Sequence, residues 1–292
     1  MKVGVDLGGT KIEALVLSDS GEELARERVA TPQGDYEGTI EALRKLVVTV
    51  EERAGGKADT IGIGTPGSSS PETGLIQNSN SVCLIGKPLD KDLEAALQRP
   101  TRMANDADCF ALSEATDGAG AGHAIVFGAI LGTGVGGGIA VNKKILSGPN
   151  SITGEWGHNP LPWPKDYELP GPECYCGKHG CIEQFLSGPG LERDHGGSLK
   201  GDEIASQAQF GDASSEDSLE RYAQRLARAL ASVINVLDPH AIVLGGGVSN
   251  IDFLYERVPT LWGDFVFTGS PRTKLLKARH GDSSGVRGAA WL

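Results

Sequence analysis

Two segments of this chain share one pattern, in which apolar runs are joined by a glycine turn. In the first segment, apolar runs at Val3–Leu7 and Ile12–Leu17 flank the sequence Gly8-Gly9-Thr10-Lys11. In the second, the apolar run His123–Leu131 leads into Gly132-Thr133-Gly134 and a further apolar run. Short apolar runs bounded by turn residues are typical of strands. The sequence therefore predicts two strand–turn–strand units, the second echoing the first.

Helical patterns alternate with the predicted strands. The stretch Thr39–Glu52 repeats apolar residues at helical spacing, and Leu219–Leu237 does so until Asp238-Pro239 stops it. The other elements that the patterns predict are strands at Ile61–Gly64, Arg102–Ala104, Gly138–Val141 and Ala241–Leu244, and helices at Leu93–Leu97 and Asp108–Ala115. Such alternation indicates an α/β protein. Gly148–Gly201, rich in Pro, Gly, Cys and His, is predicted to be a functional insertion, and Gly211–Ser215 to be a loop.

The composition limits the classes of function. The chain of 292 residues suffices for one large domain or two ordinary ones, and its formal net charge of −11 argues against a nucleic-acid surface. Nucleotide binding stays open, because backbone N–H groups and a metal ion can provide it. No apolar run reaches the roughly 18 residues that a membrane span requires, and the cysteines do not follow a secreted disulfide pattern. We therefore expect a cytoplasmic protein without membrane or nucleic-acid partners.

The glycine turns suit phosphate groups. The backbone N–H groups after Asp6 can face phosphate oxygens, and Asp6 itself can hold a metal ion through water. A plain hairpin turn with a capping Asp explains either turn equally well when it is taken alone. Two such turns that open two similar hairpins are more informative. Gly245-Gly246-Gly247, which follows a strand, fits either close approach to a nucleotide or a helix-entry turn.

The sequence Asn105-Asp106-Ala107-Asp108 places carboxylates between a predicted strand and a predicted helix. Asp106 or Asp108 could simply cap that helix. A carboxylate at a strand end could instead accept a proton from a substrate hydroxyl, since an Asp with an ordinary pKa of about 3.9 is ionised at neutral pH. Both interpretations stay open on these residues alone.

A cysteine cluster gives the strongest single signal. Cys174, Cys176 and Cys181, with His158 upstream, match the Cys3His set of a structural zinc site. The alternatives are a redox pair or three reduced buried cysteines, and His179 is too close to its neighbours to be the favoured fourth ligand. The carboxylates of Glu155 and Glu183 flank these ligands; each is either a solvated surface charge or, if zinc fixes the loop, a contact for sugar hydroxyls.

Taken in order along the chain, these motifs resemble the ROK family of repressors, open reading frames and kinases. The segments that carry the resemblance are Asp6–Lys11, Asn105–Ala107, Leu131–Gly134, Gly154–His158, Cys174–Glu183 and Gly245–Gly247. The resemblance implies an actin-like ATPase, ribonuclease H-like α/β fold with two lobes around a cleft. The expected small lobe comprises 1–115 plus 282–292, and the expected large lobe is 116–281.

The resemblance also implies a role for each matching residue. Asp106 would be the catalytic base. The expected sugar contacts are Asn80, Asn105, Glu155, His158 and Glu183. The expected nucleotide and phosphate contacts are Asp6, Gly8, Gly9, Thr10, Lys11, Gly132, Thr133, Gly134, Gly246 and Gly247. The expected zinc ligands are His158, Cys174, Cys176 and Cys181, with ATP and Mg²⁺ completing the cofactors, and His158 would turn its second ring nitrogen toward the sugar.

Within the family, the Glu155–Trp163 segment and the tail His280–Trp291 look most like bacterial fructokinases that also accept mannose. The resemblance thus favours phosphorylation of D-fructose at its 6-hydroxyl, with N-acetylglucosamine kinase and glucokinase as the alternatives. A non-catalytic sugar-binding regulator is less favoured, because family repressors carry a helix-turn-helix before this region and Asp106 is retained. Partners would be a hexose and ATP, and the sequence leaves open whether the chain forms a homodimer.

Overall fold

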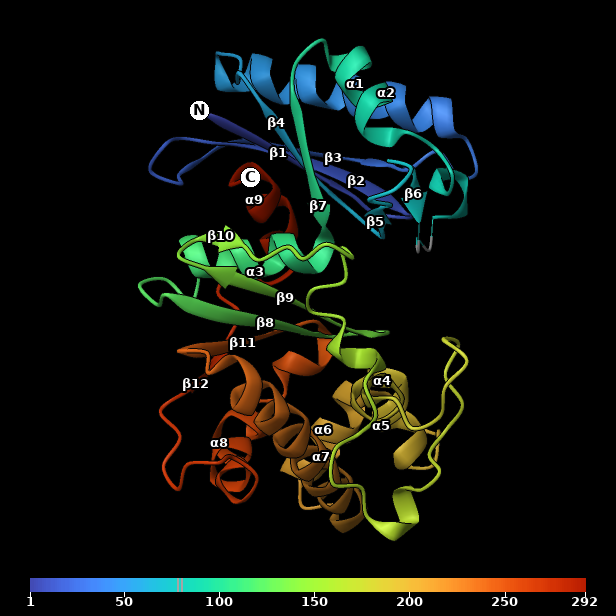
Figure 1. The fold of residues 1–292 in the computed structure, drawn as a ribbon, viewed down its shortest axis with the longest axis vertical. Coiled ribbons are helices and arrows are strands. Elements are labelled where there is room, and N and C mark those ends of the chain that lie inside the picture. Colours follow the sequence, from blue (N-terminus) through green and yellow to red (C-terminus); the bar gives the residue numbers. More distant parts are fainter. Residues whose placement is uncertain (78, 80) are drawn as a thin grey trace.

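The computed structural model describes residues 1–77, 79 and 81–292, and they include two sheets of five strands each (Figure 1). The first sheet has the order β3-β2-β1-β4-β7, and the second has the order β10-β9-β8-β11-β12. The first consists of β1 (Lys2–Leu7), β2 (Lys11–Leu17), β3 (Glu23–Ala30), β4 (Ile61–Thr65) and β7 (Thr101–Asn105). The second consists of β8 (Ile125–Leu131), β9 (Val135–Val141), β10 (Lys144–Ile145), β11 (Ala241–Gly245) and β12 (Lys274–Lys277).

The two sheets repeat one topology. In each, three antiparallel strands in sequence are followed by two strands parallel to the first. The echo between the two predicted hairpins is therefore a repeat of the whole sheet. A small pair, β5 (Ser68–Ser69) with β6 (Ile76–Gln77), stands beside the first sheet. This repeated topology is the actin-like, ribonuclease H-like fold that the sequence predicts.

Helices cover the outer faces of both sheets and fill the space between them. The helices are α1 (Tyr36–Ala54), α2 (Leu89–Leu97), α3 (Asp106–Thr116), α4 (Ile182–Leu186), α5 (Gly188–Asp194), α6 (Gly201–Gln209), α7 (Ala213–Leu237), α8 (Phe253–Leu261) and α9 (Ser284–Ala290). One apolar core joins α1 and α2 to the first sheet, and a second surrounds α7 on the second sheet. Figure 1 shows α3 and α9 between the sheets. No helix among the described residues is long and apolar enough to cross a membrane.

The two central helices pack closely because glycines lie beneath them. A Cβ on Gly4 or Gly62 of the first sheet would overlap with the backbone of α9. On the second sheet, a Cβ at Gly128 would lie 2.8 Å from Phe110, and one at Gly138 would overlap with the start of α3. Helix α9 can therefore lie almost directly on the strands of the first sheet, and α3 on those of the second. This packing positions the start of α3 between the two sheets.

One expected loop is wrong in part. Gly211–Ser215 was expected to be a loop, but α7 begins at Ala213. The side chain of Asp212 caps the helix by accepting a hydrogen bond from the Ser215 N–H (2.8 Å). The polar first turn of α7 carries no apolar stripe, so periodicity could not reveal it.

Candidate active site

The first glycine turn joins β1 to β2, and the segment after β3 holds its carbonyl oxygens. The turn closes through a hydrogen bond from the Gly8 N–H to the Lys11 carbonyl (3.0 Å). The Thr31 hydroxyl donates to the Gly8 carbonyl (2.7 Å), and the Thr31 N–H donates to the Thr10 carbonyl (3.0 Å). The Gln33 amide donates to the Gly9 carbonyl between them. Carbonyl oxygens repel phosphate. Engaging them in this way leaves the N–H groups of Gly9 and Thr10 and the Thr10 hydroxyl for an anion.

The second glycine turn, Gly132–Gly134, joins β8 to β9 and lies against two other predicted segments. The Gly188 N–H donates to the first carbonyl of this turn (2.8 Å), and the Val135 N–H donates to a carboxylate oxygen of Glu183 (3.0 Å). Gly246, with φ of 82°, packs so closely on the end of β8 that a Cβ there would overlap with the strand backbone. The structure thus brings the second turn, Glu183 and the Gly246-Gly247 loop together at one end of the second sheet.

Asp106 is the first residue of α3, directly after β7. The helix is capped by Asn105, whose side-chain oxygen accepts from the Ala107 N–H (2.9 Å) and whose amide donates to the Gly67 carbonyl (3.1 Å). Capping by Asn105 leaves Asp106 available for another role, although its carboxylate also accepts from the Ala107 N–H (2.8 Å). Burial raises the pKa of Asp106, and the N–H groups of Ala107 and Asp106 oppose that shift. The expectation of an ordinary Asp pKa is therefore wrong.

Asp6, Asp108 and Glu155 lie near Asp106, and Glu183 lies near Glu155. Burial, and then the charge of Asp106, raises the pKa of Asp6 to about 6 and that of Asp108 to about 7. Burial also raises the pKa of Glu155, to which the charges of Asp106 and Glu183 contribute. These shifts mark a continuous run of negative groups from the first glycine turn, past the start of α3, to the second turn. No hydrogen bond between described residues joins the two glycine turns directly.

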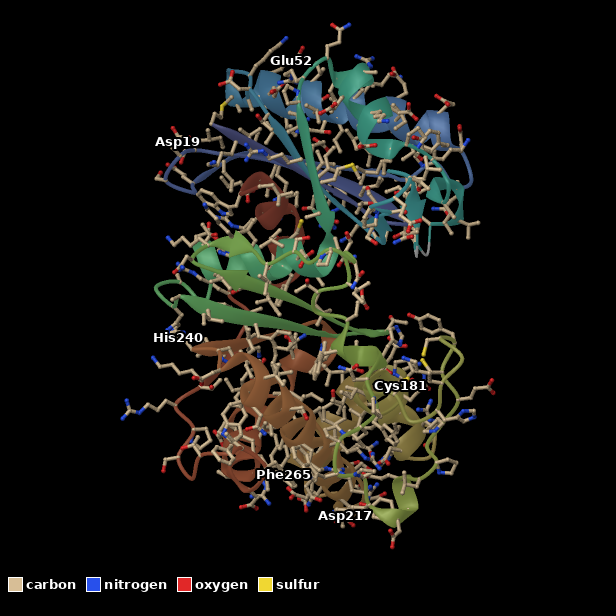
Figure 2. All side chains as sticks on the ribbon, in the orientation of Figure 1. Asp19, Glu52, Cys181, Asp217, His240 and Phe265 are labelled. Atoms are coloured by element: carbon tan, nitrogen blue, oxygen red, sulfur yellow. The ribbon has the colours of Figure 1, made fainter. Side chains whose placement is uncertain are left out.

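The four expected zinc ligands lie together. The ligand atoms of His158, Cys174, Cys176 and Cys181 are all within 4.8 Å of one another, and His179 does not belong to this group of described residues. The sulfurs of Cys176 and Cys181 are 3.6 Å apart, and the Cys174 sulfur is 3.6 Å from His158 Nδ1. A tetrahedral zinc ion at ordinary bond lengths requires about 3.8 Å between sulfurs and about 3.6 Å between sulfur and nitrogen. The residues therefore fit a zinc ion, on the half of the molecule where Figure 2 labels Cys181.

The second ring nitrogen of His158 already has a partner. Its Nε2 lies 2.9 Å from the hydroxyl of Tyr175, and the two rings meet edge to face with centroids 5.1 Å apart. Sequence reasoning expected this nitrogen to point at the sugar. The side chain of Tyr175, between two of the cysteines, was not considered.

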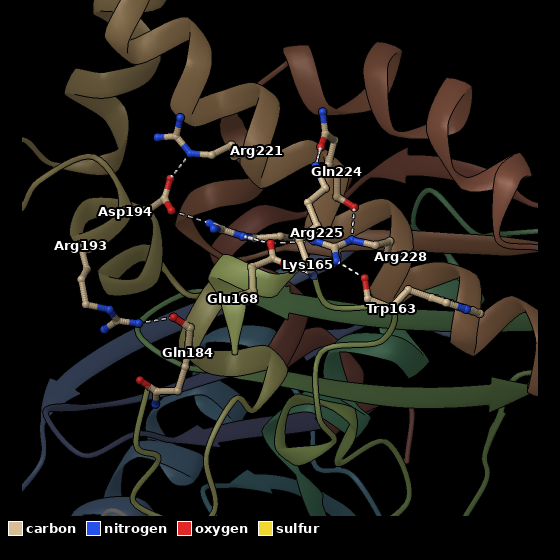
Figure 3. A network of polar contacts seen from close by, with 10 residues as sticks. All are labelled: Trp163, Lys165, Glu168, Gln184, Arg193, Asp194, Arg221, Gln224, Arg225 and Arg228. Atoms are coloured by element: carbon tan, nitrogen blue, oxygen red, sulfur yellow. Dashed lines mark hydrogen bonds and ion pairs between the residues drawn. The ribbon is translucent and has the colours of Figure 1, made fainter. Parts of the chain in front are cut away.

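A buried ion-pair network anchors the insertion to α7 (Figure 3). Glu168 accepts from Arg225 (2.8 Å) and from two nitrogens of Arg228 (2.8 Å each), and all three side chains are buried. Arg225 also donates to Asp194 on α5 (2.7 Å), and Arg228 donates to the Trp163 carbonyl. The segment that leads to the cysteine cluster is therefore fixed on the helical half of the molecule.

A cavity of about 310 Å³ lies beside Asn105, between the two sheets. Its walls come from both halves: Gly67 and Ser68 from the first, and Ser147 and Thr153 from the loop before Glu155. The remaining expected sugar contact, Asn80, lies outside the described residues.

Sequence reasoning missed the residues that support the two turns. Thr31 and Gln33 follow a strand that carries no clear alternation, and Gly188 lies five residues after Glu183 in a stretch interpreted only as insertion. The pair Thr31-Pro32 directly after β3 was the one local signal for the first turn.

The fold and the two glycine turns define a member of the actin-like ATPase class, and comparison with known proteins makes the assignment narrower. The ROK family matches residues 2–292. N-acetyl-D-glucosamine kinase of Vibrio cholerae is 40% identical over 300 residues, covering 100% of this chain and 99% of the relative. The chain belongs to the ROK family.

Solved structures agree with this assignment. The ROK hexokinase of Thermus thermophilus is 34% identical, with a TM-score of 0.87 and coverage of 100% of this chain and 97% of that one. A ROK family glucokinase from Streptomyces griseus, solved in complex with glucose and AMPPNP, is 30% identical with a TM-score of 0.78, covering 99% and 97% of the two chains. The fructokinase subtype favoured by the sequence is not represented among these relatives.

Proposed function

We propose N-acetylglucosamine as the preferred substrate of this ROK family sugar kinase, with ATP as the phosphoryl donor. The chain matches an N-acetylglucosamine kinase over nearly the whole length of both proteins. The observation that supports the chemistry is the position of Asp106, a carboxyl group at the start of α3 among Asp6, Asp108 and Glu155.

In the proposed mechanism, Asp106 accepts the proton of the sugar 6-hydroxyl as that oxygen bonds to the γ-phosphorus of ATP. The bond between the γ-phosphorus and the bridging oxygen breaks, so the products are the sugar 6-phosphate and ADP. The transition state of phosphoryl transfer is loose, so positioning and charge stabilisation contribute more than covalent chemistry. Gly8–Thr10 and Gly132–Gly134 bind the phosphates, and the Gly246-Gly247 loop lies on the adenosine side.

Two metal ions fit this scheme. Asp6 and the ATP phosphates would hold Mg²⁺, which would supply positive charge that offsets the acidic groups of the site. His158, Cys174, Cys176 and Cys181 would hold a zinc ion with four protein ligands, which would act by fixing the loop. Glu155 and Glu183 lie on either side of that loop, where they can bind sugar hydroxyls together with Asn105 and His158.

The cavity beside Asn105 supports an amino sugar. Its volume of about 310 Å³ leaves room for a 2-acetamido group, and its mixed polar and apolar walls, which include Asp108 and Leu146, suit the amide and the methyl of that group. Fructose is the second candidate, favoured by the resemblance of the Glu155–Trp163 segment to fructokinases. We propose that the two sheets are the cores of two lobes, 1–115 plus 282–292 and 116–281, which close on both substrates and exclude water.

The test is ADP formation by the purified protein with N-acetylglucosamine, fructose, mannose or glucose, in the presence of Mg²⁺. We expect the highest kcat/KM with N-acetylglucosamine. A higher value with fructose would reject the choice of sugar while leaving the kinase assignment in place. Sugar binding without any ADP formation would indicate a regulator instead.

A further inference from the structure

Tyr175 occupies an unusual position between two expected zinc ligands. Its side chain is 83% exposed, yet its hydroxyl lies 2.9 Å from His158 Nε2. The other ring nitrogen of His158, Nδ1, faces the Cys174 sulfur at 3.6 Å. The metal-facing and outward-facing nitrogens of the imidazole are therefore distinct, and Tyr175 holds the outward one.

Tyr175 and a sugar hydroxyl would compete for the same N–H of His158. A neutral imidazole that binds a metal through Nδ1 carries its proton on Nε2, so it has one N–H to donate. That N–H points at the Tyr175 oxygen, and a sugar hydroxyl that took it would have to displace the phenol. The Cys174 sulfur, which faces the other nitrogen of the same ring, also lies 4.0 Å from a carboxylate oxygen of Glu183, so this contact borders a carboxylate that we assign to the sugar.

The loop allows the phenol to leave. Gly177 adopts a φ of 82° and has no atom within 4 Å of where its Cβ would lie. Cys176, which lies between Tyr175 and Gly177, is exposed, while Cys174 and Cys181 are buried. The Tyr175 side chain therefore stands on the open side of a loop whose base is fixed.

We propose that Tyr175 is a latch on the sugar site: its hydroxyl holds His158 Nε2 until a sugar hydroxyl replaces it. This inference rests on the proposed role of His158 as a sugar contact. A sugar that presents an oxygen to His158 recovers the lost hydrogen bond, whereas an analogue without that oxygen does not. Tyr175 thereby contributes to specificity without contacting the reacting atoms.

The test is Tyr175→Phe, which removes the hydroxyl and keeps the ring. We expect the Kd for N-acetylglucosamine, measured by calorimetric titration, to fall about 3- to 10-fold. This is the size of effect of one hydrogen bond, which the sugar would no longer have to break. Zinc content and the KM for ATP should stay unchanged. Tyr167→Phe is the matched control, because Tyr167 is an exposed tyrosine of the same insertion with its ring against Lys165.

Three outcomes would overturn the latch. Unchanged sugar affinity in Tyr175→Phe would mean that the phenol does not compete, and weaker affinity would mean that it binds the sugar itself. Loss of zinc would show that the hydroxyl supports the metal ligand His158 instead. A wild-type protein that binds and phosphorylates none of the sugars would defeat the proposed function, so the two failures are distinguishable.

Discussion

Asp106 combines two properties that a general base needs. Its carboxyl group directly follows a strand of the first sheet, and burial raises its pKa above that of an ordinary Asp, which makes the carboxylate a stronger base. Because the capping of α3 falls to Asn105, substitution of Asp106 leaves the helix start intact. Asp106→Asn should therefore lower kcat by about 10²–10⁴-fold while sugar affinity changes much less. Steady-state kinetics and calorimetry check this, and a variant that keeps most of its kcat would move the base elsewhere.

Asp108 is predicted to cost the protein stability at neutral pH. Burial, followed by the charges of Asp106 and Glu155, raises its folded-state pKa to about 7, above the unfolded value of about 3.9. The unfolded chain thus loses this proton first, so the destabilisation grows from about pH 4 and levels off above pH 7. Asp108→Asn should raise Tm relative to wild type by an amount that is small at pH 5 and largest at pH 8. A constant difference across this range would show that the group does not titrate there.

At the level of single residues, the sequence indicates which side chains carry chemistry but not their state. Asp6 and Asp106 were both identified from local motifs. Their raised pKa values arise because segments far apart in the sequence bury them together, which no local pattern records. Tyr175 was missed for the same reason, since only the folded loop brings it to His158.

The first glycine turn depends on a second element for its shape. Thr31 supplies two of the three hydrogen bonds that engage the carbonyls of Gly8–Thr10. Thr31→Val keeps the side-chain shape but removes the hydroxyl, and we expect the KM for ATP to rise several-fold while the KM for sugar stays near wild type. Thr31→Ser should restore the ATP KM. Thr49→Val serves as control, because the Thr49 hydroxyl bonds only within α1, away from the turn. An equal change in both KM values would indicate general unfolding.

We expect the zinc ion of the cysteine loop to affect sugar binding far more than nucleotide binding. Chelation of zinc should lower Tm, because metal-binding energy is partly folding energy. Sugar affinity should fall much more than nucleotide affinity, since Glu155 and Glu183 flank the loop whereas the first glycine turn belongs to the first sheet. The measurement is metal analysis, then titration with sugar and with a nucleotide analogue before and after chelation. Cys176→Ser should behave like the chelated protein; equal loss of both affinities, or no stoichiometric zinc, contradicts this account.

Elements with a clear apolar pattern were predictable, and elements without one were not. Helix α1 has one buried stripe at helical spacing, and strands β1 and β2 are short apolar runs because most of their residues are buried on both faces of the sheet. The edge strand β3 is largely exposed, so its sequence shows little alternation. Helix α9 is made of small residues because it lies between the first sheet and α3, which leaves no polar face to create a stripe.

The whole molecule is organised around the contact between α3 and α9. Each helix rests on glycines of one sheet, and the two helices meet where Gly288 of α9 lies against the backbone at Cys109 of α3. Asp106, the proposed base, stands at the start of α3, so the packing of these helices sets its position relative to both glycine turns. The repeat of the two hairpins was visible in the sequence, but this close packing was not. Glycines that allow two backbones to approach closely leave no periodic apolar pattern in the sequence.

Gly288→Ala tests whether that contact controls both stability and catalysis. On helix propensity alone, alanine in place of a helical glycine stabilises by up to about 1 kcal/mol. Here the added Cβ would overlap with the Cys109 carbonyl, and backbone atoms cannot move aside as a flexible side chain can. Overpacking of this kind typically costs about 1–3 kcal/mol or more, so we expect a net loss of stability in denaturant unfolding. The control is Gly263→Ala, where no atom lies within 4 Å of the added Cβ and stability should stay within about 1 kcal/mol of wild type. Because displacement of α3 moves Asp106, the folded fraction of Gly288→Ala should also show a lower kcat. Increased stability with full kcat would mean that the two halves do not depend on this contact.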